Sequence, residues 1–395
     1  MNDKKKDIWN DDDEEETPKK GHPLRGAAIF AVTLIAVLAV VVFAAYRDGT
    51  GFDVLRRYFN YGRAESAGGA AVYNYDASSS NCFAALGEKL VVLSDTSLTL
   101  LDQQGGEVWS QNVKMSAPAL HSGGGRVVAY DVGGTELYVI DEKGTLLTIE
   151  DGEWEPPLIS ATLNEKGWLA VTSDLDNYKG CVSVYNSALE QVFAFWSSRR
   201  FVSDAYVTDD CTHLAAVTLG QEESVFVSNI VLYDLTKKDP VADYDIADGL
   251  VMAVGQDEDR LITVSDTVLT FAGTDGTVEA SYPYGGAYLR EYDLEGDGFT
   301  ALLLNRYSSG SVGRIVTVSG KGEEIASLDV NEEVLNISAA GRYLAVLYAS
   351  RLVVYNPDLQ VYASLSGTDY AKEVLMRSDG SALLAGSETA KLFLP

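Results

Sequence analysis

Cysteine and histidine are scarce in this sequence, which has three of each among 395 residues. Cys82, Cys181 and Cys211 fit neither a paired disulfide framework nor the spacing of a zinc site. We expect them to fill small apolar spaces, as free cysteine often does; a bridge between Cys181 and Cys211 is the alternative. Beyond residue 25 the only histidines are His121 and His213, both predicted in tight turns, so a Ser-His-Asp triad is not indicated.

Positive charge is also scarce, because 58 acidic residues face 30 basic ones and the net charge is −28. Residues 1–25 hold eight acids and six bases, so the rest of the chain holds 50 acids and 24 bases. An acidic body repels phosphate backbones, so we expect no nucleic-acid partner. The same charge disfavours docking flat on anionic lipid.

One long apolar run is present at residues 26–46, which contain no charged residue and lie between two arginines. Twenty-one such residues match the length of a bilayer-spanning helix. A secretory apolar region is usually shorter, so an uncleaved membrane anchor is predicted. Residues 1–25 include the run DDDEEE and are predicted to be a disordered cytoplasmic tail, followed after the anchor by a linker over residues 47–69.

The orientation of this anchor is weakly determined, because basic residues flank the run on both sides and the positive-inside rule gives no decision. Large tyrosine-rich repeat domains behind an N-terminal anchor are usually exported. We therefore expect a single-pass protein of the cell membrane, with a cytoplasmic N-terminus and an extracytoplasmic repeat domain.

The chain beyond the linker repeats a strand pattern about every forty residues, with copies such as GEKLVVLSD, GGRVVAYD and KGWLAVTSD. A period of this length built from strands indicates a propeller, solenoid or array. We name the four strands of a propeller blade A to D from the axis outwards. The B strands align on eight positions, namely Leu90, Val127, Leu169, Leu214, Leu261, Phe299, Leu344 and Leu383.

The last copy contains strands A, B and C, at residues 372–377, 382–385 and 390–394, but no D strand. An unassigned strand at residues 70–77 (AAVYNYDA) is expected to supply it. Such closure leaves only short outer edges and so limits edge-to-edge aggregation. The sequence therefore predicts an all-β fold, an eight-bladed β-propeller over residues 70–395, with a seven-bladed ring as the alternative.

One copy carries a family signature. Residues 98–109 (LTLLDQQGGEVW) resemble a pyrroloquinoline-quinone-like (WD-like) propeller repeat, and residues 141–144 match its turn without the tryptophan. With an anchor ahead of it, the chain also resembles uncharacterised single-pass membrane propellers. It is similar to propeller lipoproteins that scaffold outer-membrane assembly, without their lipobox cysteine. The quinone dehydrogenases of this fold have a calcium site and adjacent cysteines. This sequence has no adjacent cysteines, so the resemblance does not extend to their enzyme activity, and we predict no cofactor.

Two short motifs contain residue types that bind metals. Residues 209–213 (DDCTH) occupy the A–B turn, where His213 aligns with Trp168, Arg260 and Tyr343 of other copies, so a turn role is expected. Residues 293–298 (DLEGDG) resemble the start of a calcium loop, but its twelfth position, which needs a bidentate acid, is Leu304. We therefore predict no catalytic, cofactor-binding or metal-binding residues.

The two ends of the predicted blades differ in composition. The turn face, formed by the A–B and C–D turns, is short and acidic. The loop face, formed by the B–C and D–A loops, includes the longer segments 174–180, 220–229 and 305–313. Its aromatic and arginine residues form the predicted binding face, Trp154, Tyr178, Trp196, Arg199, Arg200, Tyr282, Tyr284, Arg306, Tyr307 and Tyr370.

These patterns predict a membrane-anchored, non-catalytic module that binds or scaffolds a protein or a cell-envelope polymer, such as a glycan. An ordinary rim of aromatic residues is the alternative interpretation of the loop face. A propeller enzyme, a hydrolase or lyase acting on a cell-surface glycan, is the alternative function. It requires converging acids on the A strands, which are mostly apolar or small, with Asp204, Glu291 and Asp293 as exceptions.

Overall fold

The computed structural model describes residues 30, 32–40, 53, 56, 57, 61, 71–149, 156–222, 225–246 and 249–395. The chain divides into two compact units, Met1–Arg56 and Arg57–Pro395. In the first unit, Phe30 and residues 32–40 are helical and their side chains are exposed. Among the described residues, no helix has both the length and the apolar character needed to cross a membrane. The predicted tail, both ends of the predicted span and most of the predicted linker lie outside the described residues.

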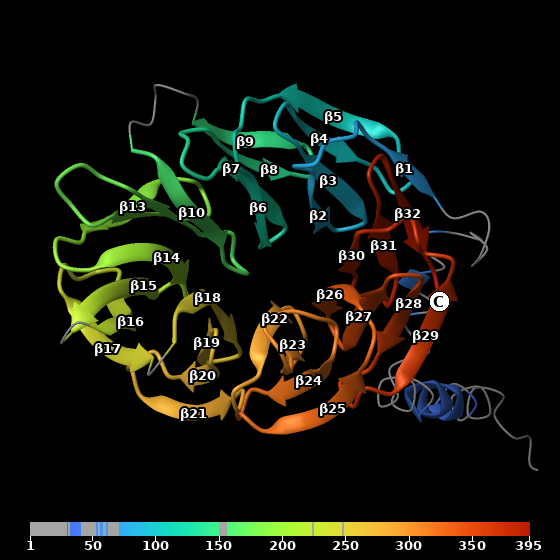
Figure 1. Cartoon of the computed structure of the whole chain (residues 1–395). Helices are drawn as coiled ribbons and strands as arrows, with labels where there is room; N and C mark the ends of the chain where they lie inside the picture. Colours follow the sequence, from blue (N-terminus) through green and yellow to red (C-terminus); the bar gives the residue numbers. More distant parts are fainter. Residues whose placement is uncertain are drawn as a thin grey trace, which may run out of the picture. The chain divides into compact units, whose positions relative to one another are not determined.

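The second unit is a ring of eight four-stranded antiparallel sheets, which are the blades of a β-propeller (Figure 1). The eight-bladed prediction is therefore confirmed and the seven-bladed alternative is wrong. Blade 1 contains β2 (Cys82–Leu86), β3 (Lys89–Leu93), β4 (Ser97–Leu101) and β5 (Glu107–Asn112), and blade 2 contains β6 (Pro118–Gly123), β7 (Arg126–Asp131), β8 (Leu137–Asp141) and β9 (Gly144–Ile149). Blade 3 contains β10 (Leu158–Leu163), β11 (Leu169–Ser173), β12 (Cys181–Tyr185) and β13 (Gln191–Trp196). Blade 4 contains β14 (Phe201–Val207), β15 (His213–Glu222), β16 (Val225–Asp234) and β17 (Pro240–Ile246).

Blades 5 to 8 follow the same order of strands. Blade 5 contains β18 (Val251–Asp257), β19 (Arg260–Ser265), β20 (Val268–Ala272) and β21 (Val278–Pro283), and blade 6 contains β22 (Tyr288–Asp293), β23 (Phe299–Asn305), β24 (Gly313–Ser319) and β25 (Glu324–Val330). Blade 7 contains β26 (Val334–Ala340), β27 (Tyr343–Tyr348), β28 (Arg351–Tyr355) and β29 (Val361–Ser366). Blade 8 contains β30 (Glu373–Met376), β31 (Ala382–Ala385) and β32 (Thr389–Phe393), with β1 (Val72–Asn74) as its outermost strand.

The ring closes in blade 8, where β1 pairs antiparallel with β32 (blue beside red in Figure 1). Tyr73 lies opposite Ala390 in this pairing, and its side chain is fully buried. It joins an apolar cluster that includes Leu90 of blade 1 and Leu383 of blade 8. The N-terminal strand therefore fastens the last blade to the first.

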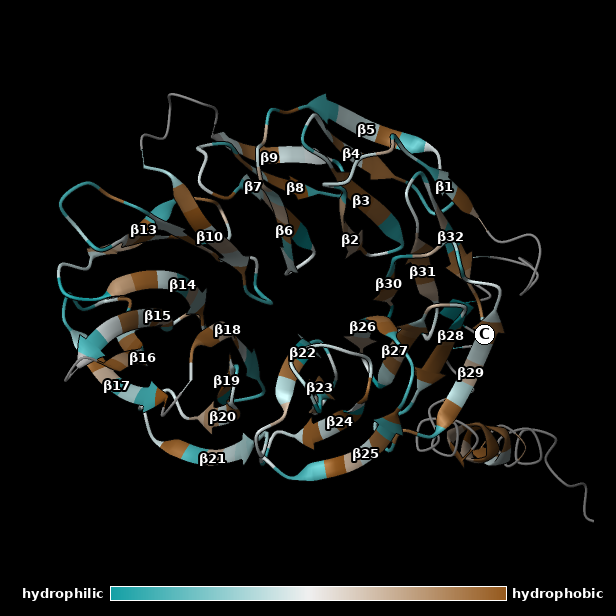
Figure 2. Ribbon diagram, in the orientation of Figure 1, coloured by the Kyte–Doolittle hydropathy of each residue, from teal (hydrophilic) through white to brown (hydrophobic). Residues whose placement is uncertain are grey.

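The core consists of eight apolar clusters, each formed by two neighbouring blades. Between blades 1 and 2, for example, Leu98 and Val127 belong to the same cluster. The middle strands supply most of these residues; β23 and β27 are buried along their whole length, whereas the outer strand β21 has only exposed and half-buried positions. Figure 2 shows that β21 carries both hydrophobic and hydrophilic stretches. Each buried Leu or Val contributes roughly 1.5–3 kcal/mol.

A second set of contacts joins the A strands around the axis. Several polar side chains of one A strand accept hydrogen bonds from backbone N–H groups of the next blade, which would otherwise lie unpaired at a sheet edge. The donor and acceptor pairs are Leu163 N to His121 Nδ1 (3.1 Å), Ile337 N to Glu291 Oε2 (2.9 Å), Ala339 N to Asp293 Oδ2 (2.9 Å), Val374 N to Asn336 Oδ1 (2.8 Å) and Met376 N to Ser338 Oγ (3.0 Å).

The prediction that His121 lies in a tight turn is wrong, because His121 lies in strand β6. The turn consists of Gly124 and Gly125, both of which have positive φ angles. Because glycine adopts this backbone conformation without steric cost, the strand extends to Gly123 before the chain reverses.

Candidate functional site

Nine of the ten residues predicted for the binding face lie at the loop-face ends of their blades, and Trp154 lies outside the described residues. Arg199 is exposed, as are Tyr178, Trp196 and Tyr307, at 45%, 57% and 58% of their surfaces. Tyr284, in contrast, is 1% exposed and packs between blades 5 and 6. The remaining members are spread over several blades, with Tyr370 before β30 in blade 8. A binding role for this set stays a prediction.

Arg200 has a structural contact within this set. Its Nη2 donates to the carbonyl of Val227 at 2.8 Å, and the Ser197 hydroxyl donates to the Arg200 carbonyl at 2.5 Å. The first bond fastens the D–A loop of blade 3 to the B–C hairpin of blade 4, and the second closes the D–A loop on itself. Arg200 therefore shapes the loop face, while the neighbouring Arg199 is exposed there.

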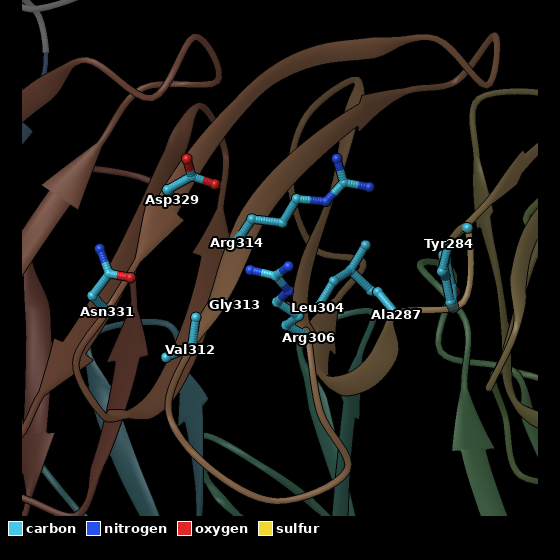
Figure 3. Close-up of a pocket in the computed structure, with 10 residues that line it drawn as sticks. Tyr284, Ala287, Leu304, Arg306, Val312, Gly313, Arg314, Asp329 and Asn331 are labelled. Carbon is cyan, nitrogen blue, oxygen red and sulfur yellow. The ribbon is translucent and has the colours of Figure 1, made fainter.

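The B–C loop of blade 6 separates two pockets. Its ends are held by hydrogen bonds from Arg306 N to the Val312 carbonyl (2.9 Å) and from Asn305 Nδ2 to the Gly310 carbonyl (3.0 Å). The cavity of about 390 Å³ on one side is called here the blade 6 pocket (Figure 3), and it is lined by Tyr284, Gly285, Ala287, Leu304, Arg306, Val312, Gly313, Arg314, Asp329 and Asn331.

The second cavity, of about 520 Å³, is lined by Arg290, Leu303, Asn305, residues 308–311, Glu332, Glu333 and Val334. Leu303 and Leu304 are consecutive residues of β23 and line different cavities. Because side chains alternate across a strand, the two cavities lie on opposite sides of β23.

Two arginines, Arg306 and Arg314, line the blade 6 pocket together with Asp329. Arg314 Nη2 lies 3.5 Å from the Tyr282 hydroxyl, and its Nη1 lies 3.9 Å from the Glu324 carboxylate. Tyr282 donates a shorter hydrogen bond, 2.5 Å, to the same carboxylate. Desolvation and this bond to Glu324 raise the pKa of Tyr282 to about 12. Tyr282 thus stays protonated and positions the carboxylate that faces Arg314.

Arg306 has more unused hydrogen-bonding capacity than Arg314. Its guanidinium lies 5.7 Å from the centre of the Tyr307 ring. Within the described part of the chain, this guanidinium forms no hydrogen bond or ion pair. Because a guanidinium carries five N–H donors, Arg306 is able to bind a planar anion at the pocket.

Several functional candidates were not predicted from the sequence. The length of residues 305–313 drew attention to Arg306, but Arg314, Asp329 and Asn331 also line the pocket. Leu304 pairs with Arg314, and Arg314 pairs with Asp329, in the register of blade 6. The alternation of side chains along β23, extended to its partner strands, is the sequence signal that could have identified these pocket residues.

Acidic residues of the A strands, and Glu295 in the turn after β22, have raised pKa values. Desolvation raises the pKa of Asp204 and of Asp293 to about 6. Desolvation also raises the pKa of Glu295 and of Glu373 to about 7, with the charge of Asp293 adding to the first and that of Glu291 to the second. Among the described residues, no group of three His, Cys, Asp or Glu side chains is placed to hold a metal ion.

The turn at residues 209–213 is stabilised by its own side chains. Thr208 Oγ1 donates to Asp210 Oδ1 at 2.6 Å, and Thr212 N donates to the same oxygen at 3.0 Å. Cys211 adopts a positive φ angle of 60° in this turn. Cys82, Cys181 and Cys211 are all free thiols, so the alternative of a Cys181–Cys211 bridge is wrong.

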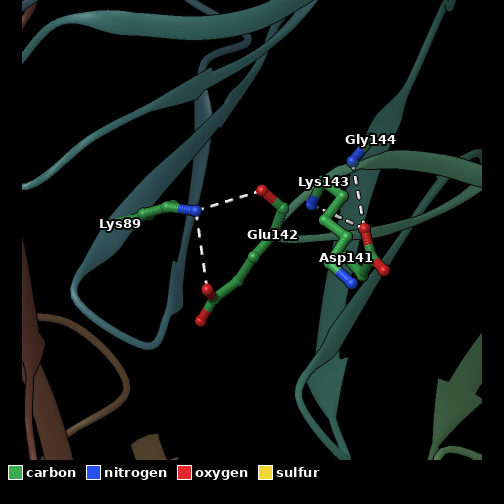
Figure 4. A network of polar contacts seen from close by, with 5 residues as sticks. All are labelled: Lys89, Asp141, Glu142, Lys143 and Gly144. Carbon is green, nitrogen blue, oxygen red and sulfur yellow. Dashed lines mark hydrogen bonds and ion pairs between the residues drawn. The ribbon is translucent and has the colours of Figure 1, made fainter.

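Acids of the turn face also have structural contacts. Asp141 Oδ1 accepts hydrogen bonds from Lys143 N (2.6 Å) and Gly144 N (3.0 Å), which shapes the C–D turn of blade 2 (Figure 4). Lys89 of blade 1 donates to the Glu142 carbonyl at 3.0 Å and lies 3.5 Å from its carboxylate. Aspartate is common in turns because its side chain accepts such backbone bonds. Part of the acidic charge is therefore explained by turn formation.

The fold and these contacts define a β-propeller protein. Within this class, the chain belongs to the family of unknown function DUF5711, whose model matches residues 63–377. No curated protein matches the sequence.

Solved propellers share the fold at low sequence identity. The C-terminal WD40 domain of Sif2 has a TM-score of 0.59 and 16% identity, covering 82% of this chain and 99% of its own. BamB from Moraxella catarrhalis has a TM-score of 0.53 and 10% identity, and the match covers 82% of this chain and 98% of BamB. The quinohemoprotein alcohol dehydrogenase ADHIIG from Pseudomonas putida HK5 has a TM-score of 0.54 and 9% identity, and the match covers 82% of this chain and 75% of the dehydrogenase. The resemblance to quinone-type and WD-type propellers therefore holds at the level of the fold.

Proposed function

We propose that this chain is a non-catalytic binding or scaffold module, which contacts a protein or a cell-envelope polymer through its loop face. We also propose that residues 26–46 anchor it in the cell membrane, with the N-terminus in the cytoplasm and the propeller outside.

One observation carries the binding proposal. In the described residues of the propeller, all six exposed aromatic side chains lie at the loop face of blades 3, 4 and 6; they are Tyr178, Trp196, Phe201, Phe226, Tyr288 and Tyr307. Isolated exposed apolar residues are ordinary, but gathered aromatic residues beside arginines are typical of binding surfaces. Loops on a rigid scaffold are the usual position for such contacts.

The anchor proposal is supported by the composition of residues 26–46 and by the exposed apolar helix within them. Phe30 is 70% exposed and Val40 is 67% exposed. Such side chains are stabilised in a lipid environment.

A C-terminal tag tests the orientation. We expect external protease to remove the tag from intact cells. A tag that is cleaved only after lysis contradicts a propeller outside the membrane.

A photo-crosslinking amino acid tests the loop face. Placed at Phe226 or Tyr307 in the full-length chain, it should give ultraviolet-dependent adducts in intact membranes. The matched control is Val361, which is 64% exposed on the outer strand of blade 7. Adducts of equal yield from Val361 contradict a specific binding face.

An enzyme acting on a cell-surface glycan is the second candidate, favoured by the raised pKa values of Asp204, Asp293 and Glu295. A carboxyl group with a pKa near the working pH is suited to general acid catalysis. The bonds from backbone N–H groups to Glu291 and Asp293 support a structural role instead. Incubation with envelope glycan tests it; a release of reducing ends that falls about 100-fold in Asp204→Asn favours the enzyme.

A further inference from the structure

We propose that the blade 6 pocket binds the carboxylate of an acidic sugar residue within a polysaccharide. This inference rests on the proposed function, since it names the class of polymer that the loop face recognises. Three features carry it, namely two guanidinium groups at the pocket, hydrogen-bond acceptors beside them and one exposed aromatic ring next to Arg306.

The first feature is a pair of guanidinium groups on one side of the sheet. Arg314 lies opposite Leu304 in the register of β23 and β24, and Arg306 follows Leu304 by two residues. The alternation of side chains therefore places both arginines on the side of Leu304. Figure 3 shows both side chains at the cavity. Guanidinium groups bind carboxylates through parallel hydrogen bonds, which fix both position and orientation.

The loose contacts of these arginines leave donors available for a ligand. The distances from Arg314 to Tyr282 and Glu324 are 3.5 and 3.9 Å, longer than strong charge-assisted hydrogen bonds. The guanidinium of Arg306 has only its ring contact with Tyr307 within the described residues. An incoming carboxylate therefore gains hydrogen bonds without breaking a strong ion pair.

The second feature is a set of acceptors that a hydroxyl-rich ligand satisfies. Asp329 and Asn331 are exposed and line the same cavity as the two arginines. Residues 308–311 and Glu333 line the neighbouring cavity across β23. Carboxylates and amide oxygens accept hydrogen bonds from sugar hydroxyls. An acidic peptide presents fewer hydroxyl donors to Asp329 and Asn331, so these acceptors favour an acidic sugar over an acidic peptide.

The third feature is an exposed aromatic ring beside the pocket, because Tyr307 is 58% exposed and its ring centre lies 5.7 Å from the Arg306 guanidinium. An aromatic ring offers an apolar surface with a polar tip, which suits the face of a sugar ring. The cavity of about 390 Å³ lies within the size range of small-ligand pockets. The pocket thus suits one acidic sugar residue, with the chain continuing over the loop.

Calorimetric titration of the detergent-solubilised full-length chain tests this proposal. The probe is a hexasaccharide that alternates glucuronate and N-acetylglucosamine, and the neutral N-acetylglucosamine hexasaccharide and hexaglutamate are compared with it. We expect the acidic sugar to bind at least tenfold more tightly than either. Arg306→Gln and Arg314→Gln should each weaken it about tenfold or more, as expected for a lost hydrogen bond to a charged group.

The matched control is Arg260→Gln, because Arg260 lies at the turn face and pairs with Glu279 at 2.6 Å. It should change the affinity less than twofold, and all variants should unfold at similar temperatures. Equal binding of the neutral sugar, tighter binding of hexaglutamate, or unchanged affinity in both pocket variants overturns the proposal. If the loop-face cross-links form while the hexasaccharide fails to bind, this inference fails and the proposed function stands.

Discussion

Arg57 shows how one buried charge is accommodated at the start of the propeller unit. Its side chain is 6% exposed; Nη1 donates to the Asp379 carbonyl at 2.7 Å, and Nη2 lies 3.2 Å from the Tyr362 hydroxyl, to which it donates. We predict that Arg57→Met lowers the free energy of unfolding by about 2 kcal/mol, because the Asp379 carbonyl loses a charged donor. Denaturant titration measures it. Arg199→Met, at an exposed site, should stay within about 0.5 kcal/mol, and an equal loss there contradicts the prediction.

Glu291 tests the hydrogen bonds between A strands at a single residue. Its carboxylate accepts a bond from Ile337 N at 2.9 Å, from the neighbouring blade. Glu291→Gln keeps a side-chain oxygen and should leave stability nearly unchanged. Glu291→Ala should cost about 1 kcal/mol because the N–H loses its protein acceptor. Thermal unfolding of the two variants measures the difference, and equal midpoints contradict a role for this bond.

The β1 strand closes the ring, although it contributes only Val72–Asn74. We predict that Tyr73→Ala lowers stability by about 3–5 kcal/mol, as expected when a large buried aromatic side chain is removed. Val72→Ala is the control, because Val72 is 42% exposed in the same strand. Chemical denaturation of both variants measures the effect. A similar cost at the two positions means that the apolar cluster between blades 8 and 1 does not hold the closure.

The elements were predictable to different degrees. The eight B strands were predicted because buried strands carry unbroken apolar runs between glycine-rich turns. The closing strand was predicted because the last copy lacks a D strand, although β1 covers only Val72–Asn74 of the predicted residues 70–77. The segment at residues 220–229 was predicted as a long loop, but β15 and β16 extend into it and pair up to Glu222 and Val225. Its alternating polar and apolar residues belong to a hairpin. Phe226, 69% exposed there, was missed for this reason.

The candidate site was less predictable than the fold. The loop lengths indicated the correct face, but Tyr284 was predicted as a contact residue and is buried between blades. Its environment depends on the packing of blade 5 against blade 6, which one sequence does not reveal. The same holds for the acceptors of the A strands, whose partners lie about forty residues away in the next blade.

For the molecule as a whole, carboxyl groups with raised pKa values make the stability of the fold depend on pH. The folded ring holds carboxyl groups near its axis whose pKa values are raised, to about 6 for Asp204 and Asp293 and to about 7 for Glu295 and Glu373. Between about pH 4 and pH 7 the folded protein therefore binds protons that the unfolded chain releases. Their contribution is fully present below the unfolded pKa values and is lost as the pH rises through 6 and 7.

His121 acts in the opposite direction, because burial lowers its pKa to about 4. The unfolded chain then binds a proton between about pH 4 and pH 6.5 that the folded protein does not, and this destabilises the fold as the pH falls. Four carboxyl groups outweigh one imidazole. We therefore predict a higher thermal unfolding midpoint at pH 5.5 than at pH 7.5.

Paired substitutions assign this pH dependence to the axis of the ring. Asp293→Asn with Glu295→Gln removes two of the four groups, so the difference between the midpoints at pH 5.5 and pH 7.5 should shrink. Asp275→Asn is the control, because bonds from Thr277 lower the pKa of that exposed carboxyl and place its titration below this window. A midpoint that rises from pH 5.5 to pH 7.5, or a double variant with an unchanged difference, means that other groups determine the stability of the folded ring.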